Sequence, residues 1–275
     1  MKKNDVEKNE NYDLISFNTP LFKRDFFILV AIILFGAVLI FLQRFMEPEM
    51  GRDSTLYVLL IEKWSHGGFA RVLEYWPDFG VPPLFVYLGT LLTYTGLSPE
   101  NAAMVISMGC GILMPLVTFA IAGEIFHDRR ISLAAALLTA FNPSIIEMSV
   151  QAQRDVPYLF TAGWSIYLII AGIHRNKWYW WCAAGCVWGL ALSFRFEILE
   201  FLPVLGMYFI FAVRKKKEQW IIYLKNTVIF TVCGGFIAIA VLYMTGTAKM
   251  IFNEYKDRIA FNLLRPDLTK GGQQK

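Results

Sequence analysis

Charged residues are scarce in this sequence, and long apolar runs take their place. Only 17% of the 275 residues are Asp, Glu, Lys or Arg, whereas 56% are hydrophobic and the mean hydropathy is +0.46. Soluble domains carry about 25% charged residues, so this composition indicates an integral membrane protein. The net charge of +4 comes from short loops between apolar runs, and it is therefore no sign of nucleic-acid binding.

Motifs for metals, disulfides and nucleotides are also missing. The chain has three histidines, no C-x-x-C pair and four cysteines, all within apolar runs: Cys110, Cys182, Cys186 and Cys233. This pattern predicts neither a disulfide framework nor a metal site. There is no P-loop or other glycine-rich phosphate loop, which argues against direct binding of a nucleotide.

The apolar runs predict an all-α membrane protein with about seven transmembrane helices. The runs cover residues 26–42, 101–126, 131–148, 157–173, 178–194, 201–213 and 221–245. Most have the roughly 17–25 residues that a crossing needs. The run at 82–97 is shorter, so we expect an interfacial or re-entrant segment within an outer loop at 44–100.

Four basic clusters beside the apolar runs support this topology because all four fall on one side of the membrane. They lie at Lys23/Arg24, Arg129/Arg130, Arg175/Lys177 and Arg214–Lys217. The positive-inside bias makes that side the cytoplasm. We therefore expect a cytoplasmic tail at 1–25, a membrane core at 26–245 and an outer polar tail at 246–275. Glu124 precedes one basic loop, and we expect it to pair with Arg129.

The outer loop contains an amphipathic segment, 54–66, that ends at Gly67–Gly68. Its apolar face has helical spacing and consists of Tyr57, Leu60, Ile61 and Trp64. Such a helix beside a membrane span lies along the bilayer surface. Asp53 stands at its start, and two interpretations stay open: a helix N-cap or a catalytic base at the edge of the membrane.

Three outer connections each bring acids and arginines together. They contain Arg52, Asp53 and Glu62; Glu147, Arg154 and Asp155; and Arg195, Glu197 and Glu200. A carboxylate can remove a proton from an acceptor hydroxyl or amine, and a guanidinium can bind a phosphate with two hydrogen bonds. The pattern predicts an enzyme that acts on a lipid phosphate at the outer face, with Glu197, Glu62 and Arg52 in supporting positions.

Five segments carry a resemblance to a known family. They read GRDSTLYVLLIEKW, PPLFVYLGTLLTYTGLS, FHDRRISLAAALLTAFNPS, QRDVPYLF and GLALSFRFEILEFLP, and the resemblance covers roughly Arg44 to Val213. In order and spacing they resemble the GT-C membrane glycosyltransferases, in particular the protein O-mannosyltransferase and aminoarabinose-transferase branch.

The resemblance implies inverting transfer of a sugar from a polyprenyl-phosphate-linked donor to a protein, lipid or glycan acceptor. The reaction would take place on the outer face of the cell (inner) membrane, with no certain cofactor and with a divalent metal left open. Asp53 matches the family's catalytic acid and Asp155 its second outer acidic position. Arg195, with Arg154 nearby, matches a basic position that faces the donor phosphate.

The sequence departs from the family pattern in three places. Ser54 stands where a second acid often follows the catalytic one, and Gly80–Val81 stands where a basic residue often precedes the Pro82–Pro83 pair. The chain also stops soon after its seventh expected span, which fits a minimal, truncated or partner-dependent form. The alternative is a secondary transporter or a non-catalytic lipid-binding module. Charges at the outer ends rather than at mid-membrane favour the enzyme.

Overall fold

The computed structural model describes residues 20–47, 49–76, 83–201 and 220–248, with a few single positions between 203 and 210. Regular structure in these residues is helical throughout, as expected for an all-α membrane protein. The elements are α1 (Pro20–Met46), α2 (Arg52–Tyr75), α3 (Leu84–Thr93), α4 (Pro99–Phe126), α5 (Arg129–Ala140), α6 (Pro143–Val150), α7 (Asp155–Arg175), α8 (Trp178–Phe194), the 3-10 helix η1 (Phe196–Phe201) and α10 (Trp220–Met244).

Four helices, α1, α4, α7 and α10, are long and apolar enough to cross a membrane, and a fifth crossing results if α5 and α6 form one broken span. Helix α8 has 17 residues, which is at the lower limit for a crossing. The expected span at 201–213 lies largely outside the described residues. The count of seven therefore stays a prediction. The ten-residue α3 agrees with the prediction that segment 82–97 is too short to cross.

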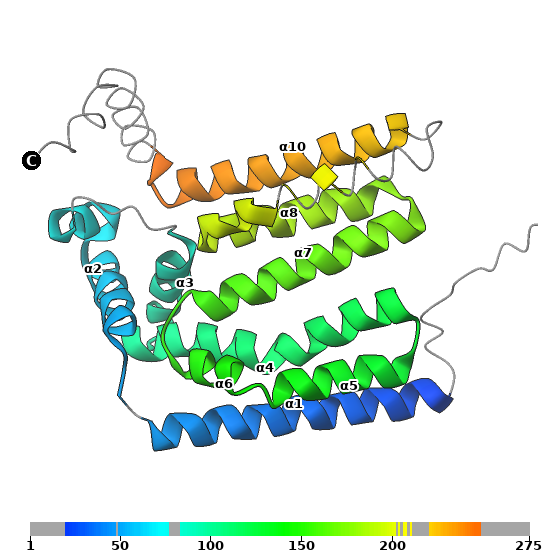
Figure 1. Ribbon diagram of the computed structural model, residues 1–275. Coiled ribbons are helices and arrows are strands. Elements are labelled where there is room, and N and C mark those ends of the chain that lie inside the picture. The colour runs from blue at the N-terminus through cyan, green and yellow to red at the C-terminus, as the bar shows by residue number, and fades with distance from the viewer. Residues whose placement is uncertain are drawn as a thin grey trace, which may run out of the picture.

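The long helices lie side by side, and α2 runs across one end of them (Figure 1). Helices α3 and α6 lie at this same end, which we call the α2 end. There the last turn of α1 is tied to the first turn of α4, because Arg44 Nη2 donates to Glu100 Oε1 at 2.8 Å. The α4–α5 and α7–α8 turns lie at the opposite end, where the His127 and His174 rings are 5.6 Å apart. We call this the basic end.

The third expected span, 131–148, is broken into α5 and α6, which meet at an angle of 51°. Asn142 begins α6, and its side-chain oxygen accepts hydrogen bonds from the backbone N–H groups of Ser144 and Ile145 at 3.0 and 3.3 Å. Pro143 occupies the first turn, where its missing N–H costs nothing. The Asn142 cap therefore begins α6 as a separate helix, two residues after α5 ends at Ala140.

Helices α8 and α10 run parallel and in close contact. A Cβ placed on Gly185 would meet the backbone of Phe230, and one placed on Gly189 would meet the carbonyl of Gly234. The contact advances by four residues along both helices, so their directions agree. Because parallel neighbours start at the same end, Trp178 and Trp220 lie at the basic end and α8 and α10 both run towards the α2 end.

The expected pairing of Glu124 with Arg129 is wrong. Glu124 is buried at the basic end, where its two carboxylate oxygens lie 3.3 Å from His174 Nδ1 and 3.0 Å from Arg175 Nη2. Arg129 instead pairs with Asp25 of α1 at 3.3 Å. The reason is that α4 packs beside α7, so the end of α7 is closer to Glu124 than the loop that follows it in sequence.

Candidate active site

Arg195 is the centre of a charged group at the α2 end. It follows α8 in extended backbone, and its guanidinium donates through Nη1 to Asp155 Oδ1 and through Nη2 to Glu197 Oε1, the latter at 2.7 Å. Asp155 is the first residue of α7 and lies forty residues away in sequence. The structure thus brings two of the three charged outer connections into direct contact.

Electrostatics keep this group ionised at neutral pH. The hydrogen bond from Arg195 is the main reason that the pKa of Glu197 falls from 4.5 to about 2. The same hydrogen bond raises the pKa of Arg195 above its ordinary value. Nε of Arg195 is buried and has no hydrogen-bond partner in the described part of the chain. One N–H donor of a fixed cation is therefore left for a ligand.

Tyr57 connects helix α2 to the same group. Its ring is buried and packs edge-on against Phe85, with centroids 5.3 Å apart. Burial raises the pKa of the Tyr57 hydroxyl; the nearby charges of Arg154 and Arg195 lower it, and that of Asp53 raises it. All three outer connections therefore act on this one hydroxyl. Sequence analysis missed Tyr57 as a site residue because it fits the apolar face of its helix.

Asp53 lies one helical turn before Tyr57, in the first turn of α2. The interpretation of Asp53 as a helix N-cap is wrong, because Gly51 occupies the cap position and no side chain caps this helix. The Asp53 side chain is exposed and makes no hydrogen bond or ion pair with any residue that the structure describes. Its carboxylate is therefore available to accept a proton. The expected break at Gly67–Gly68 is confirmed as a kink within α2.

Two of the predicted supporting residues lie away from this group. Glu62 follows Asp53 by nine residues, or about 13 Å along an α-helix, and its side chain is exposed. Arg52 precedes Asp53 and is also exposed, with no ion pair to the described residues. Of the predicted residues, Asp53, Arg154, Asp155, Arg195 and Glu197 are those that gather around Tyr57 and Arg195.

Three cysteines come together elsewhere, which the sequence analysis did not expect. The sulfur atoms of Cys182, Cys186 and Cys233 lie within 4.8 Å of one another at the contact of α8 with α10. Cys182 precedes Arg195 by thirteen residues, which is about 20 Å along an α-helix. The thiol cluster is thus separate from the charged group, and the carboxylates beside Arg195 do not form such a ligand set in the described ranges.

Comparison with known proteins agrees with this arrangement. The model of the family described as dolichyl-phosphate-mannose-protein mannosyltransferase matches residues 80–255, well over half of the chain. The match includes Arg154, Asp155, Arg195 and Glu197, and it begins within the outer loop, after Asp53. A search of curated proteins found no match. The chain belongs to the dolichyl-phosphate-mannose-protein mannosyltransferase family, a branch of the GT-C membrane glycosyltransferases.

Proposed function

We propose that this protein transfers a sugar from a polyprenyl-phosphate-linked donor to a protein, lipid or glycan acceptor, with inversion at the sugar carbon. One observation carries the proposal. At a single end of a membrane bundle, the Arg195 guanidinium is held by Asp155 and Glu197. The charges of Arg195 and of the Asp53 carboxylate, which has no partner among the described residues, both act on the buried Tyr57 hydroxyl. The family match supports sugar transfer as the chemistry.

Arg154 and Arg195 are the proposed phosphate-binding residues. Two carboxylates fix the orientation of Arg195, and its Nε–H, which has no partner among the described residues, would donate to a phosphate oxygen. A guanidinium suits this task because it stays charged and binds phosphate oxygens directionally. Asp155 then acts through Arg195, as a positioning residue. The apolar spans adjoin the site and offer a hydrocarbon environment for the polyprenyl tail.

Asp53 is the proposed general base. As the acceptor oxygen or nitrogen attacks the anomeric carbon, its proton passes to the Asp53 carboxylate. The bond between that carbon and the phosphate oxygen breaks, and the phosphate leaves with the electron pair. Arg154 and Arg195 stabilise the negative charge that develops on it. Attack from the face opposite the phosphate inverts the anomeric carbon.

The α2 end is the proposed outer end. The basic loops lie at the opposite end, and such loops are retained in the cytoplasm. Residues 1–25 then form a cytoplasmic tail, residues 26–245 the catalytic core, and residues 246–275 an outer tail. The protein would be a multi-pass protein of the cell membrane.

Replacement of Asp53 by Asn tests the base. The purified protein is reconstituted in vesicles and supplied with polyprenyl-phosphate mannose, and release of polyprenyl phosphate is measured. We expect a fall of about 10²–10⁴-fold in the rate, the usual contribution of a general base, with unchanged membrane insertion. Glu74→Gln is the matched control, because Glu74 is an exposed acid of α2 that pairs only with Arg71 among the described residues. Undiminished transfer by Asp53→Asn would remove Asp53 from the mechanism.

A further inference from the structure

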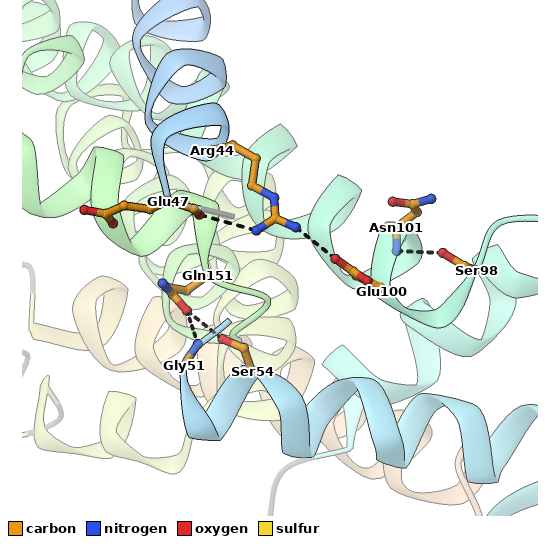
Figure 2. A network of polar contacts seen from close by, with 8 residues as sticks. All are labelled: Arg44, Glu47, Gly51, Ser54, Ser98, Glu100, Asn101 and Gln151. Atoms are coloured by element: carbon orange, nitrogen blue, oxygen red, sulfur yellow. Dashed lines mark hydrogen bonds and ion pairs between the residues drawn. The ribbon is translucent and has the colours of Figure 1, made fainter. Parts of the chain in front are cut away.

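Gln151 joins two parts of the site that are about a hundred residues apart. Its side-chain oxygen accepts two hydrogen bonds, from the Gly51 backbone N–H at 3.0 Å and from Ser54 Oγ at 2.9 Å (Figure 2). Gly51 and Ser54 flank Asp53 in the first turn of α2. Gln151 lies at the end of α6, three residues before Arg154. A neutral amide therefore holds the turn that carries the proposed base.

The fit at this contact is tight. Ser54 is fully buried and Gln151 is half-buried, so the loss of the Ser54 hydrogen bond leaves a hydroxyl with little access to water. A Cβ placed on Gly51 would lie 3.2 Å from the Gln151 oxygen. Glycine at this position thus gives the amide room to approach the start of the helix, where backbone N–H groups lack partners within the helix.

The connection after Gln151 is fixed from its other side as well. Gln153 donates its backbone N–H to Ser107 Oγ at 3.2 Å, and Ser107 Oγ donates to the Gln153 carbonyl oxygen at 2.8 Å. Ser107 is buried in α4. The short segment 151–153 is consequently held by both α2 and α4 before it continues into Arg154 and Asp155.

We propose that Gln151 is a positioning residue that sets the distance between Asp53 and the arginine group. The inference rests on the proposed function and extends it, because it names what aligns the base with the phosphate-binding residues. Without the amide oxygen, the first turn of α2 loses its link to the α6–α7 connection. A displacement of about 1 Å at a reacting group can lower a rate by about 10²-fold.

The test compares three variants with the wild-type protein. Gln151→Leu removes the acceptor at similar volume, whereas Gln151→Glu keeps an acceptor oxygen. Gln43→Leu is the matched control, since Gln43 is a half-buried glutamine of α1 whose side chain makes no hydrogen bond with the described residues. The readouts are kcat and KM for polyprenyl-phosphate mannose, the pH profile of kcat, hydrogen exchange of the peptide 49–60, and Tm.

For Gln151→Leu we expect kcat to fall by about 10²-fold, KM to change little and exchange in peptide 49–60 to accelerate. We expect Tm somewhat below that of Gln43→Leu, because the buried Ser54 hydroxyl loses its acceptor. For Gln151→Glu we expect kcat to recover at higher pH. The added negative charge beside Asp53 disfavours ionisation of the base, so the acid limb of the profile moves up in pH. If Gln151 only stabilised the fold, Gln151→Glu would not shift the acid limb of the pH profile of kcat.

Several outcomes would overturn the inference. Unchanged exchange in Gln151→Leu would show that the amide does not hold α2, and unchanged kcat would show that it does not align the base. A loss of kcat that Gln151→Glu fails to restore at any pH would also contradict it. If the wild-type protein transfers no sugar at all, the proposed function fails, and hydrogen exchange alone then decides whether Gln151 fixes this turn.

Discussion

The two ends of the bundle use the same kinds of ion pair in opposite ways. At the α2 end one arginine lies between two carboxylates, and the side chains of Arg195, Asp155 and Glu197 are 28%, 26% and 43% exposed. At the basic end one carboxylate lies between two bases, and the side chain of Glu124 is only 5% exposed. Partly hydrated pairs can rearrange for a ligand at small cost, whereas a buried acid cannot lose its partners cheaply.

The comparison teaches that charge alone does not mark a functional site in a membrane protein. Glu124 has both oxygens engaged by His174 and Arg175 and connects the ends of α4 and α7. Within the described residues, the Arg195 group instead keeps an N–H donor without a partner, and the Asp53 carboxylate, also without a partner there, acts on the same Tyr57 hydroxyl. We therefore expect changes at the α2 end to affect turnover and changes at the basic end to affect stability.

Among changes that test the comparison of the two ends, the largest effect is expected from Arg195→Lys. Lysine keeps the positive charge but cannot contact Asp155, Glu197 and a phosphate at the same time, because it lacks the planar fork of donors. Removal of one donor from a developing negative charge typically lowers kcat by 10²–10³-fold, and we expect a loss of about 10²-fold. Turnover assays and thermal unfolding in detergent check this. A matching fall in Tm would place Arg195 in the same class as Glu124.

An intermediate effect, on stability alone, is expected from Glu124→Gln. The amide cannot satisfy both His174 and Arg175 as an anion does, although these bases are 42% and 26% exposed and can be rehydrated. We expect a loss of about 1–3 kcal/mol, the range for hydrogen bonds to charged groups. Unfolding measured in detergent should show the loss while kcat stays at the wild-type value. A large fall in kcat with unchanged Tm would reverse the assignment of the two ends.

The smallest effect is the pH dependence of the Arg195–Glu197 pair. The pKa of Glu197 is lowered in the folded protein to about 2 from its ordinary 4.5. The pair therefore stabilises the fold fully above about pH 4.5, and this contribution disappears as the pH falls towards 2. Glu197→Gln should lower stability at pH 7 by at most about 1 kcal/mol, as exposed pairs do, and by less at pH 3. If the difference in unfolding free energy between the wild-type protein and Glu197→Gln grew as the pH fell, the pairing would be contradicted.

The topology expected from the sequence favours contact between Asp155 and Arg195, because it places both at the same end of neighbouring helices. Arg195 follows one apolar run and Asp155 precedes another, and the two runs are joined by a short basic turn at the far end. The end of the first run and the start of the second are therefore neighbours at the basic end. Because the two helices pack side by side, their other ends, which carry Asp155 and Arg195, are neighbours as well. Helical periodicity likewise predicted the buried face of α2 and its interruption at Gly67–Gly68.

Contacts that depend on the register between elements were not predictable in this way. The hydrogen bonds of Gln151 require α2 and α6 to meet at particular residues, and no pattern in either segment encodes that register. Glu124 was assigned to the nearest base in sequence, although its partners lie some fifty residues away. The break in the third span did leave a signal, since Asn142–Pro143 is a typical turn and helix-start pair.

The glycines that let α8 and α10 touch also limit how the Arg195 group can respond to a ligand. With backbone against backbone at Gly185 and Gly189, neither helix can rotate about its axis without driving a neighbouring side chain into the other. Arg195 directly follows α8, so its backbone position is restrained by the tight packing of α8 against α10.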